Sequence, residues 1–335
     1  MQLCIGTCLI YAVINDEDGQ AQNIPGISSA RLADLRVIIH ENDPRVLQLA
    51  MECISNVPKA NYLLLSTVHE LEAETIDSIK AIIPIPVYSV GPVIPYLELG
   101  ENPLVNSDHS HDYMKWLNSQ PAESVLYISF GSFLSVSSAQ MDQIAEALNS
   151  SKIRYLWVAR REASRLTDKC GDKGMVVPWC DQLKVLSHSS IGGFWSHCGW
   201  NSTLEAIFAG VPMLTFPLLM DQVPNSSQIV GEWNNGCRIE KSKLDSEVNV
   251  AKEYIEELVK SFMDLEREEG KKIRDRTQVY LRVEFLDDIQ AFEQRHFLLE
   301  GLSATRKCAL RVDNALGGTD VCYIVISLYL CNDGN

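Results

Sequence analysis

One short stretch of the chain, residues 194–205 with the sequence FWSHCGWNSTLE, indicates its architecture most clearly. An apolar strand ends at His197, Gly199 allows a sharp turn, and the polar residues after it are typical of a helix start. Backbone N–H groups at such a helix start point into the preceding loop and favour an anion there. Taken alone, the junction is equally compatible with a purely structural turn. As a functional element, it predicts a phosphate cradle to which His197 adds a donor.

Short apolar strands alternate with helices on both sides of this stretch. The expected strands are 125–130, 155–159, 175–177, 193–195 and 213–216, and the expected helices are 138–148, 182–186 and 202–209. Such alternation predicts βαβ units and a parallel, doubly wound α/β sheet. Ligands of these sheets bind beyond the carboxyl ends of the strands. The residues that follow the strands are therefore the candidates for a binding site.

The remaining segments suggest how the chain is divided. Residues 1–92, with strands at 62–66 and 87–90 and a helix at 70–80, predict part of an N-terminal domain, and residues 93–115 a linker. Residues 116–276 form the predicted C-terminal domain, which ends in a helical region with one apolar face. That face consists of Ile255, Leu258, Val259, Phe262 and Leu265. Residues 277–335 form a tail whose apolar run, 321–331, reads as a strand or as aberrant translation.

Composition excludes several classes of partner. With 335 residues, 46% of them hydrophobic, the chain is long enough for two globular domains. Its net charge of −15 disfavours nucleic acid and anionic membrane surfaces, because a negative field repels phosphates at long range. A phosphate ligand must therefore be captured locally.

Several features predict a cytoplasmic protein without membrane insertion. The ten cysteines show neither CxxC pairs nor metal-ligand spacing, as expected of reduced core thiols. The apolar run 3–14 has no basic region before it, and the run 321–331 is too short to span a bilayer. Asn201-Ser202-Thr203 is a glycosylation sequon inside the proposed cradle, and a glycan there would block it.

Residues 179–222 as a whole resemble the signature of plant secondary-product UDP-glycosyltransferases. The matching positions are Trp179, Gln182, Leu186, His188, Phe194, 197–202, Glu205, Gly210, Pro212, Pro217, Asp221 and Gln222. A chance match at so many fixed spacings is very improbable. The resemblance extends over residues 24–275 and is strongest within the signature.

The resemblance implies a GT-B fold, in which two Rossmann-like domains face each other and the C-terminal one binds a UDP-sugar. It places Trp179 against the uracil and Gln182 at the base or ribose. Glu205 would accept hydrogen bonds from the ribose hydroxyls, a task that suits the two oxygens of a carboxylate. The alternatives are a core indole for Trp179 and a first-turn helix carboxylate for Glu205.

The same resemblance assigns the diphosphate to His197, Asn201 and Ser202, with Ser132 as a further contact. The side chains that it places against the sugar are Trp200, Asp221 and Gln222. Asp221 has an alternative as a helix N-cap. We interpret His188, which also matches the signature, as a structural residue that bonds to the backbone.

By resemblance, the reaction is an inverting transfer of glucose from UDP-glucose to a hydroxyl or carboxyl of a small plant metabolite. Trp200 and Gln222 favour glucose within the family. UDP-sugar is a co-substrate, no cofactor is implied, and no metal is implied because the helix dipole and side chains stabilise the leaving diphosphate.

The sequence departs from the family at both ends. Residues 24–35 resemble a segment from well inside the N-terminal domain, so the chain is expected to be truncated at its N-terminus, and the tail diverges. The family's general-base histidine follows the first strand, and neither His40 nor His69 has that setting. The catalytic residue is thus unknown, and the alternative function, which the missing base favours, is UDP-sugar binding without turnover. A GT-B epimerase or phosphorylase is a third hypothesis that no local sequence supports.

Overall fold

The computed structural model describes residues 57, 62–89, 110–131, 136–218, 221–239, 244–245, 249–281 and 323–325. By contacts the chain divides into two units, and each is described by itself. Unit 1 comprises Met1–Val93, Leu219–Pro224 and Val283–Asn335, and unit 2 comprises Ile94–Leu218 and Asn225–Arg282. Within the described residues, no helix is both long and apolar enough to cross a membrane.

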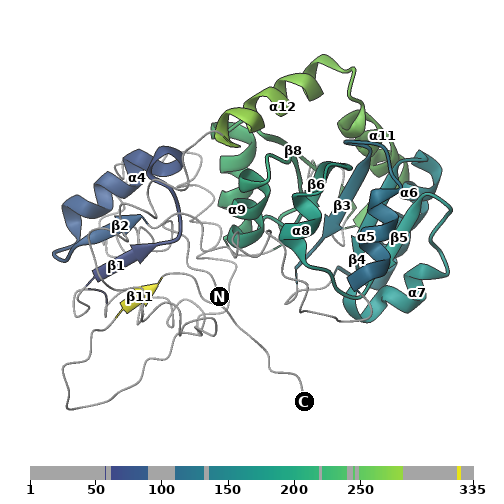
Figure 1. The fold of residues 1–335 in the computed structure, drawn as a ribbon, viewed down its shortest axis with the longest axis horizontal. Coiled ribbons are helices and arrows are strands. Elements are labelled where there is room, and N and C mark those ends of the chain that lie inside the picture. The colour runs from purple at the N-terminus through teal and green to yellow at the C-terminus, as the bar shows by residue number, and fades with distance from the viewer. Residues whose placement is uncertain are drawn as a thin grey trace, which may run out of the picture. The chain divides into compact units, whose positions relative to one another are not determined.

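Unit 2 is built on a six-stranded sheet (Figure 1). Its strands are β3 (Val125–Ser129), β4 (Arg154–Val158), β5 (Gly174–Val177), β6 (Ile191–Ser196), β7 (Met213–Thr215) and β8 (Gly236–Arg238). The order is β5-β4-β3-β6-β7-β8, and every pairing is parallel. The chain starts in the middle, winds outward to β5 and returns to the other side of β3. This order confirms the predicted doubly wound sheet and puts the topological switch point between β3 and β6.

Helices precede, connect and follow these strands. They are α5 (Ser110–Asn118), α6 (Ser138–Ser151), η3 (Arg160–Glu162), α7 (Ala163–Thr167), α8 (Gln182–Leu186), α9 (Trp200–Phe208), α10 (Gln222–Ser227), the π-helix η4 (Gln228–Glu232), α11 (Lys252–Met263) and α12 (Glu268–Leu281). A short antiparallel pair, β9 (Leu244–Asp245) and β10 (Asn249–Val250), precedes α11. The bounds of α8 agree with the prediction, whereas α5 begins inside the segment predicted as a linker.

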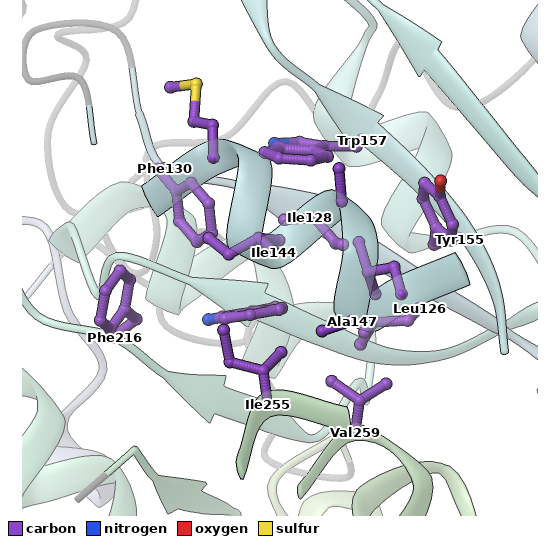
Figure 2. Packing of buried hydrophobic residues seen from close by; sticks show 14 of the residues in the cluster. Leu126, Ile128, Phe130, Ile144, Ala147, Tyr155, Trp157, Phe216, Ile255 and Val259 are labelled. Atoms are coloured by element: carbon purple, nitrogen blue, oxygen red, sulfur yellow. The ribbon is translucent and has the colours of Figure 1, made fainter. Parts of the chain in front are cut away.

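The central strands are buried on both faces, as parallel strands usually are. Leu126 and Ile128 of β3 belong to a core that α6 and α11 contribute to through Ile144 and Ile255 (Figure 2). Because successive side chains of a strand alternate between faces, Tyr127 points to the opposite face. There it stacks on Phe194 of β6, with ring centroids 4.9 Å apart. On this second face the Tyr127 hydroxyl reaches Gln182 of α8, and α8 contacts α9.

The helical region after residue 248 is two helices, not one continuous face. Helix α11 ends because the Asp264 side chain accepts a hydrogen bond from the Glu266 N–H at 3.0 Å, an Asx-type turn that competes with helical bonding. Ile255, Val259 and Phe262 are buried as predicted, but Leu265 lies in this turn and is 39% exposed. The prediction for Leu265 was therefore wrong.

Unit 1 contains a smaller parallel sheet. Its strands are β1 (Tyr62–Leu65), β2 (Val87–Ser89) and β11 (Tyr323–Val325), in the order β11-β1-β2, with α4 (His69–Ile82) between β1 and β2. Leu63, Leu65, Ile76 and Val87 form its core. Strand β11 lies inside the apolar run 321–331, so the described part of that run is a strand. The predicted domain limits remain a proposal.

Candidate functional site

The candidate site lies at the carboxyl ends of β3 and β6, at the switch point of the sheet. Gly131 follows β3 with a φ of +80°, and Gly199 precedes α9. A Cβ atom on Gly131 would lie 2.7 Å from His197 Nε2, and one on Gly199 would lie 2.6 Å from the same nitrogen. The imidazole of His197 therefore lies against two positions that have no room for a side chain. Doubly wound sheets bind their ligands at this point.

Burial determines the charge of His197. It lowers the pKa of the imidazole to about 4, and a hydrogen bond with the Ser129 backbone opposes only part of that effect. The ring is thus neutral at pH 7 and carries one N–H donor. Its Nδ1 atom is buried and has no hydrogen-bond partner within the described part of the chain. In the tautomer that carries the single proton on Nδ1, and not on the nitrogen bonded to the Ser129 backbone, a ligand oxygen would accept a hydrogen bond from Nδ1 and satisfy it.

The loop between His197 and α9 is held in a conformation that few residues adopt. Cys198 has a φ of 67°, in the left-handed region that is unfavourable for a residue with a side chain. The Ser196 hydroxyl accepts a hydrogen bond from the Cys198 N–H at 3.0 Å, and the Asn225 amide donates to the Cys198 carbonyl at 2.9 Å. Ser196 and Asn225 thus fix the loop. The sequence interpretation missed both.

Helix α9 begins at Trp200, two residues before the predicted start. Its N-cap is Gly199, and no side chain caps the helix. The N–H groups of a first helical turn have no acceptor within the helix, so Asn201 and Ser202 lie where an anion is stabilised. Glu205 consequently lies in the second turn. Its alternative interpretation as a first-turn carboxylate is wrong.

Gln182, Ser202 and Glu205 form one polar cluster between α8 and α9. Gln182 Nε2 donates to Glu205 Oε2 at 2.7 Å and to Ser202 Oγ at 3.0 Å. Burial raises the pKa of Glu205 to about 7, the Gln182 hydrogen bond lowers it, and the charge of Asp181 raises it. The structure therefore brings three of the predicted site residues together. A carboxyl with a pKa near 7 changes its hydrogen-bonding capacity within the physiological range.

The two site tryptophans have opposite environments. Trp179 follows β5 and is 58% exposed, which excludes the alternative of a core indole. The Trp200 ring is 3% exposed and packs against Trp233, with ring centroids 6.0 Å apart. Trp179 thus offers an aromatic face to a ligand, whereas the Trp200 side chain is buried against Trp233.

Three predicted site residues do not belong to the described part of unit 2. Ser132 is outside the described residues. Asp221 and Gln222 belong to the segment Leu219–Pro224 of unit 1. Gln222 is the buried first residue of α10, and Asp221 occupies the position of an N-cap.

The remaining histidines of the sequence analysis are His188, His69 and His40. His188 Nδ1 is 2.8 Å from Ser190 Oγ and its Nε2 is 3.0 Å from Asn118 Oδ1, so the ring joins α5 to the segment before β6. Its Nδ1 also accepts a hydrogen bond from the Ser190 backbone N–H at 3.2 Å, which agrees with the predicted bond to the backbone. His69 Nε2 lies 3.0 Å from Asp77 on α4, and His40 is outside the described residues. Among the described residues, no group of three His, Cys, Asp or Glu side chains could hold a metal ion.

Comparison with known proteins identifies the family. A family model described as UDP-glucoronosyl and UDP-glucosyl transferase matches residues 46–260. The chain belongs to this family. UDP-glycosyltransferase 87A2 of Arabidopsis thaliana is 48% identical over 261 residues, which are 78% of this chain and 56% of that relative. (R)-mandelonitrile beta-glucosyltransferase of Prunus dulcis is 33% identical over 276 residues, 77% of this chain and 55% of that enzyme. The chain thus spans about half the length of the curated relatives it matches.

Solved structures of the family show the same architecture. Phytolacca americana UGT2, complexed with UDP-2fluoro-glucose and pterostilbene, matches with a TM-score of 0.71 and 27% identity over 88% of this chain and 70% of that one. A variant of Os79 from O. sativa in complex with UDP matches with a TM-score of 0.71 and 25% identity, covering 88% and 71% of the two chains. The α/β fold of the GT-B type is therefore confirmed.

Proposed function

We propose that this family member binds a UDP-sugar at the switch point of unit 2 and transfers the sugar to a small acceptor. The observation that supports the proposal is the cluster of Gln182, Ser202 and Glu205 beside the uncapped start of α9. A nucleoside diphosphate needs acceptors for its ribose hydroxyls and donors for its phosphates, and this part of α9 supplies both.

The two ends of the nucleotide would meet different residues. The exposed Trp179 would stack on the uracil, Gln182 would bond to the base or ribose, and Glu205 would accept bonds from the ribose hydroxyls. The diphosphate would lie against His197 Nδ1 and the first turn of α9. The residues that complete the proposed site are Asn201, Ser202 and Ser132 at the diphosphate, and Trp200, Asp221 and Gln222 at the sugar. Glucose is the sugar we propose.

The proposed reaction is a single inverting displacement. An oxygen of the acceptor hydroxyl or carboxyl forms a bond to C1 of the sugar while the bond from C1 to the phosphate oxygen breaks, and UDP leaves with the electron pair. Negative charge grows on the diphosphate, where the α9 N–H groups and the neutral His197 ring would stabilise it. The acceptor proton passes to a general base, to which we assign no residue.

Titration of the full chain with UDP-glucose tests the proposal. We expect calorimetric binding with a dissociation constant of about 1 μM to 1 mM, the usual range for enzyme substrates. Addition of a phenolic or carboxylic acceptor should then release UDP. Binding without release would indicate the alternative function, a relative that retains the donor without turnover. The proposed site would be contradicted if UDP-glucose did not bind.

Binding of UDP-glucose should depend on pH through Glu205. Only the ionised carboxyl accepts two ribose bonds, and the pKa is raised to about 7, so affinity is complete above pH 7 and is lost as the pH falls through 7. For one proton, the loss between pH 8 and pH 6 is about tenfold. The diphosphate diester of UDP-glucose does not titrate in this window, and neither does His197. Glu205→Gln should bind weakly and without this pH dependence, and a wild-type affinity that stays flat would contradict the role of Glu205.

We also propose a cytosolic location. The sequon at Asn201 coincides with the first turn of α9, where a glycan would obstruct the diphosphate. Fractionation of the tissue that expresses the chain would test this location.

A further inference from the structure

A line of hydrogen bonds runs from the core of unit 2 to the proposed donor site. Tyr127, on the central strand β3, is 1% exposed and its ring stacks on Phe194. The Tyr127 hydroxyl lies 3.4 Å from Cys180 Sγ and donates to Gln182 Oε1 at 3.2 Å. The nitrogen of the same Gln182 amide donates to Glu205. Four side chains thus form one continuous chain of contacts.

The available protons give this series of hydrogen bonds a direction. A tyrosine hydroxyl has one proton, and in this arrangement it points to Gln182 Oε1. Burial raises the pKa of Cys180 to about 12, so its thiol is protonated at pH 7 and can donate to the Tyr127 oxygen. Each member then donates to the next, in the order Cys180, Tyr127, Gln182 and Glu205. The series ends at Glu205, whose ionised carboxylate accepts hydrogen bonds and donates none.

We propose that Tyr127 is a positioning residue of the donor site, which holds the Gln182 amide in the orientation that donates to Glu205. The inference rests on the proposed function, because the ribose hydroxyls are the groups that Glu205 would bind. Without the Tyr127 hydroxyl, the Gln182 amide is free to turn its oxygen toward Glu205. A carbonyl oxygen there requires a protonated carboxyl, which cannot accept two ribose bonds.

The charges around Glu205 make the orientation of Gln182 consequential. Asp181, the N-cap of α8, raises the pKa of Glu205, although Lys184 lies 3.2 Å from Asp181 and compensates part of its charge. Tyr127 and Cys180 face Glu205 as neutral groups, because burial keeps both protonated. Within the described residues, Gln182 is the only group that lowers the pKa of Glu205. Any change that turns the Gln182 amide should therefore favour the protonated carboxyl.

The same sheet supplies a matched control. Tyr155 of β4 is also 1% exposed, and its hydroxyl also contacts an amide oxygen and a thiol, Asn149 Oδ1 at 3.3 Å and Cys170 Sγ at 3.3 Å. Tyr155 belongs to the core on the α6 side of the sheet (Figure 2), whereas Tyr127 faces α8 and α9. Tyr155→Phe thus removes a comparable buried hydroxyl that has no route to Glu205.

The test compares Tyr127→Phe and Tyr155→Phe by calorimetric titration of the full chain with UDP-glucose across pH 6 to 9. For Tyr127→Phe we expect a roughly fivefold loss of affinity at pH 7, the size of one hydrogen bond. The pH midpoint of binding should also rise by about half a unit. At pH 7 the wild type should release roughly half a proton per UDP-glucose bound, because the pH then equals the pKa of Glu205. Tyr127→Phe should release more than this. Tyr155→Phe should match the wild type in all three measurements.

A double-mutant cycle shows whether Tyr127 acts through Gln182. In a Gln182→Leu background, Tyr127→Phe should cause no further loss of affinity and no further shift of the midpoint. A second pair leaves Tyr127 in place: Cys180→Ser keeps a donor to its oxygen and should retain the wild-type midpoint, whereas Cys180→Val should raise it. This pair decides the matter if Tyr127→Phe does not fold.

The possible outcomes separate the two proposals. If the wild type does not bind UDP-glucose, the proposed function fails. If the wild type binds UDP-glucose but Tyr127→Phe and Tyr155→Phe have the same pH midpoint of binding, the role of Tyr127 is overturned and the proposed function stands. Additive effects of Tyr127→Phe and Gln182→Leu would likewise overturn the role of Tyr127.

Discussion

Replacement of His197 with alanine should weaken UDP-glucose binding by about 30-fold, the equivalent of about 2 kcal/mol for one hydrogen bond to a charged oxygen. The reason lies in the burial of the ring. Its Nδ1 atom is buried without a protein partner among the described residues, and the imidazole is neutral because its pKa is lowered to about 4. Alanine removes the donor. It also removes the hydrogen bond to the Ser129 backbone, so a loss of about 1 kcal/mol of unfolding free energy should accompany the loss of affinity.

The rate of sugar transfer should fall further than the affinity, by roughly 10²-fold, because the departing diphosphate gains charge in the transition state. His188→Ala is the control. His188 bonds to Ser190 and Asn118, so this variant should lose about 1 kcal/mol of unfolding free energy while binding UDP-glucose normally. Calorimetry and thermal unfolding of the two variants measure the contrast. Normal binding by His197→Ala would refute the assignment of His197 to the diphosphate.

The sequence predicts the frame of this site well because the signals are local. Strand β3 is a continuous apolar run that ends in Gly131, and α8 is predicted with its observed bounds, Gln182–Leu186. The parallel, doubly wound sheet also follows, since the alternation of strands and helices predicts βαβ units. The placement of His197 and Ser202 beyond the strand ends then requires no long-range information.

The supporting contacts could not be predicted because they join distant segments. Tyr127 reads as one more apolar residue of a buried strand, and its hydroxyl partner Gln182 lies 55 positions further along the chain. Asn225 holds the Cys198 carbonyl from 27 positions away. The only signal for Tyr127 is a polar atom on a residue whose strand is buried on both faces, since such an atom needs a partner. That signal predicts a hydrogen bond but not its recipient.

Short or weakly apolar elements were missed for a different reason. Among the side chains of α5 whose burial the structure describes, only Tyr113 and Leu117 are buried, in a polar stretch, so its periodicity is faint. The burial of Trp200 was missed as well, because its match to the family signature says nothing about how buried its ring is. Its ring packs against Trp233, just after the π-helix η4, and this packing depends on a bulge that no local pattern indicates.

Gly131→Ala should reduce both stability and donor binding. Gly131 has a φ of +80°, and its new Cβ would lie 2.7 Å from His197 Nε2, closer than van der Waals contact. The left-handed conformation and the displaced ring together should cost about 2 kcal/mol of unfolding free energy. Because the imidazole must move, UDP-glucose affinity should fall about 30-fold, as for His197→Ala. Gly231→Ala is the control, since a Cβ there meets nothing within 4 Å and should leave both quantities within about 0.5 kcal/mol.

The combined variant Gly131→Ala/His197→Ala distinguishes a displaced ring from a general disturbance of the loop. With the imidazole absent, the methyl group introduced by Gly131→Ala has space, and only the cost of the left-handed backbone, about 1 kcal/mol, should remain. Affinity should then equal that of His197→Ala alone. Denaturant unfolding and UDP-glucose titration of the four chains of the cycle measure both quantities. Additive losses of affinity would mean that Gly131 acts on the ligand directly, through the backbone beyond β3, and not through the position of His197.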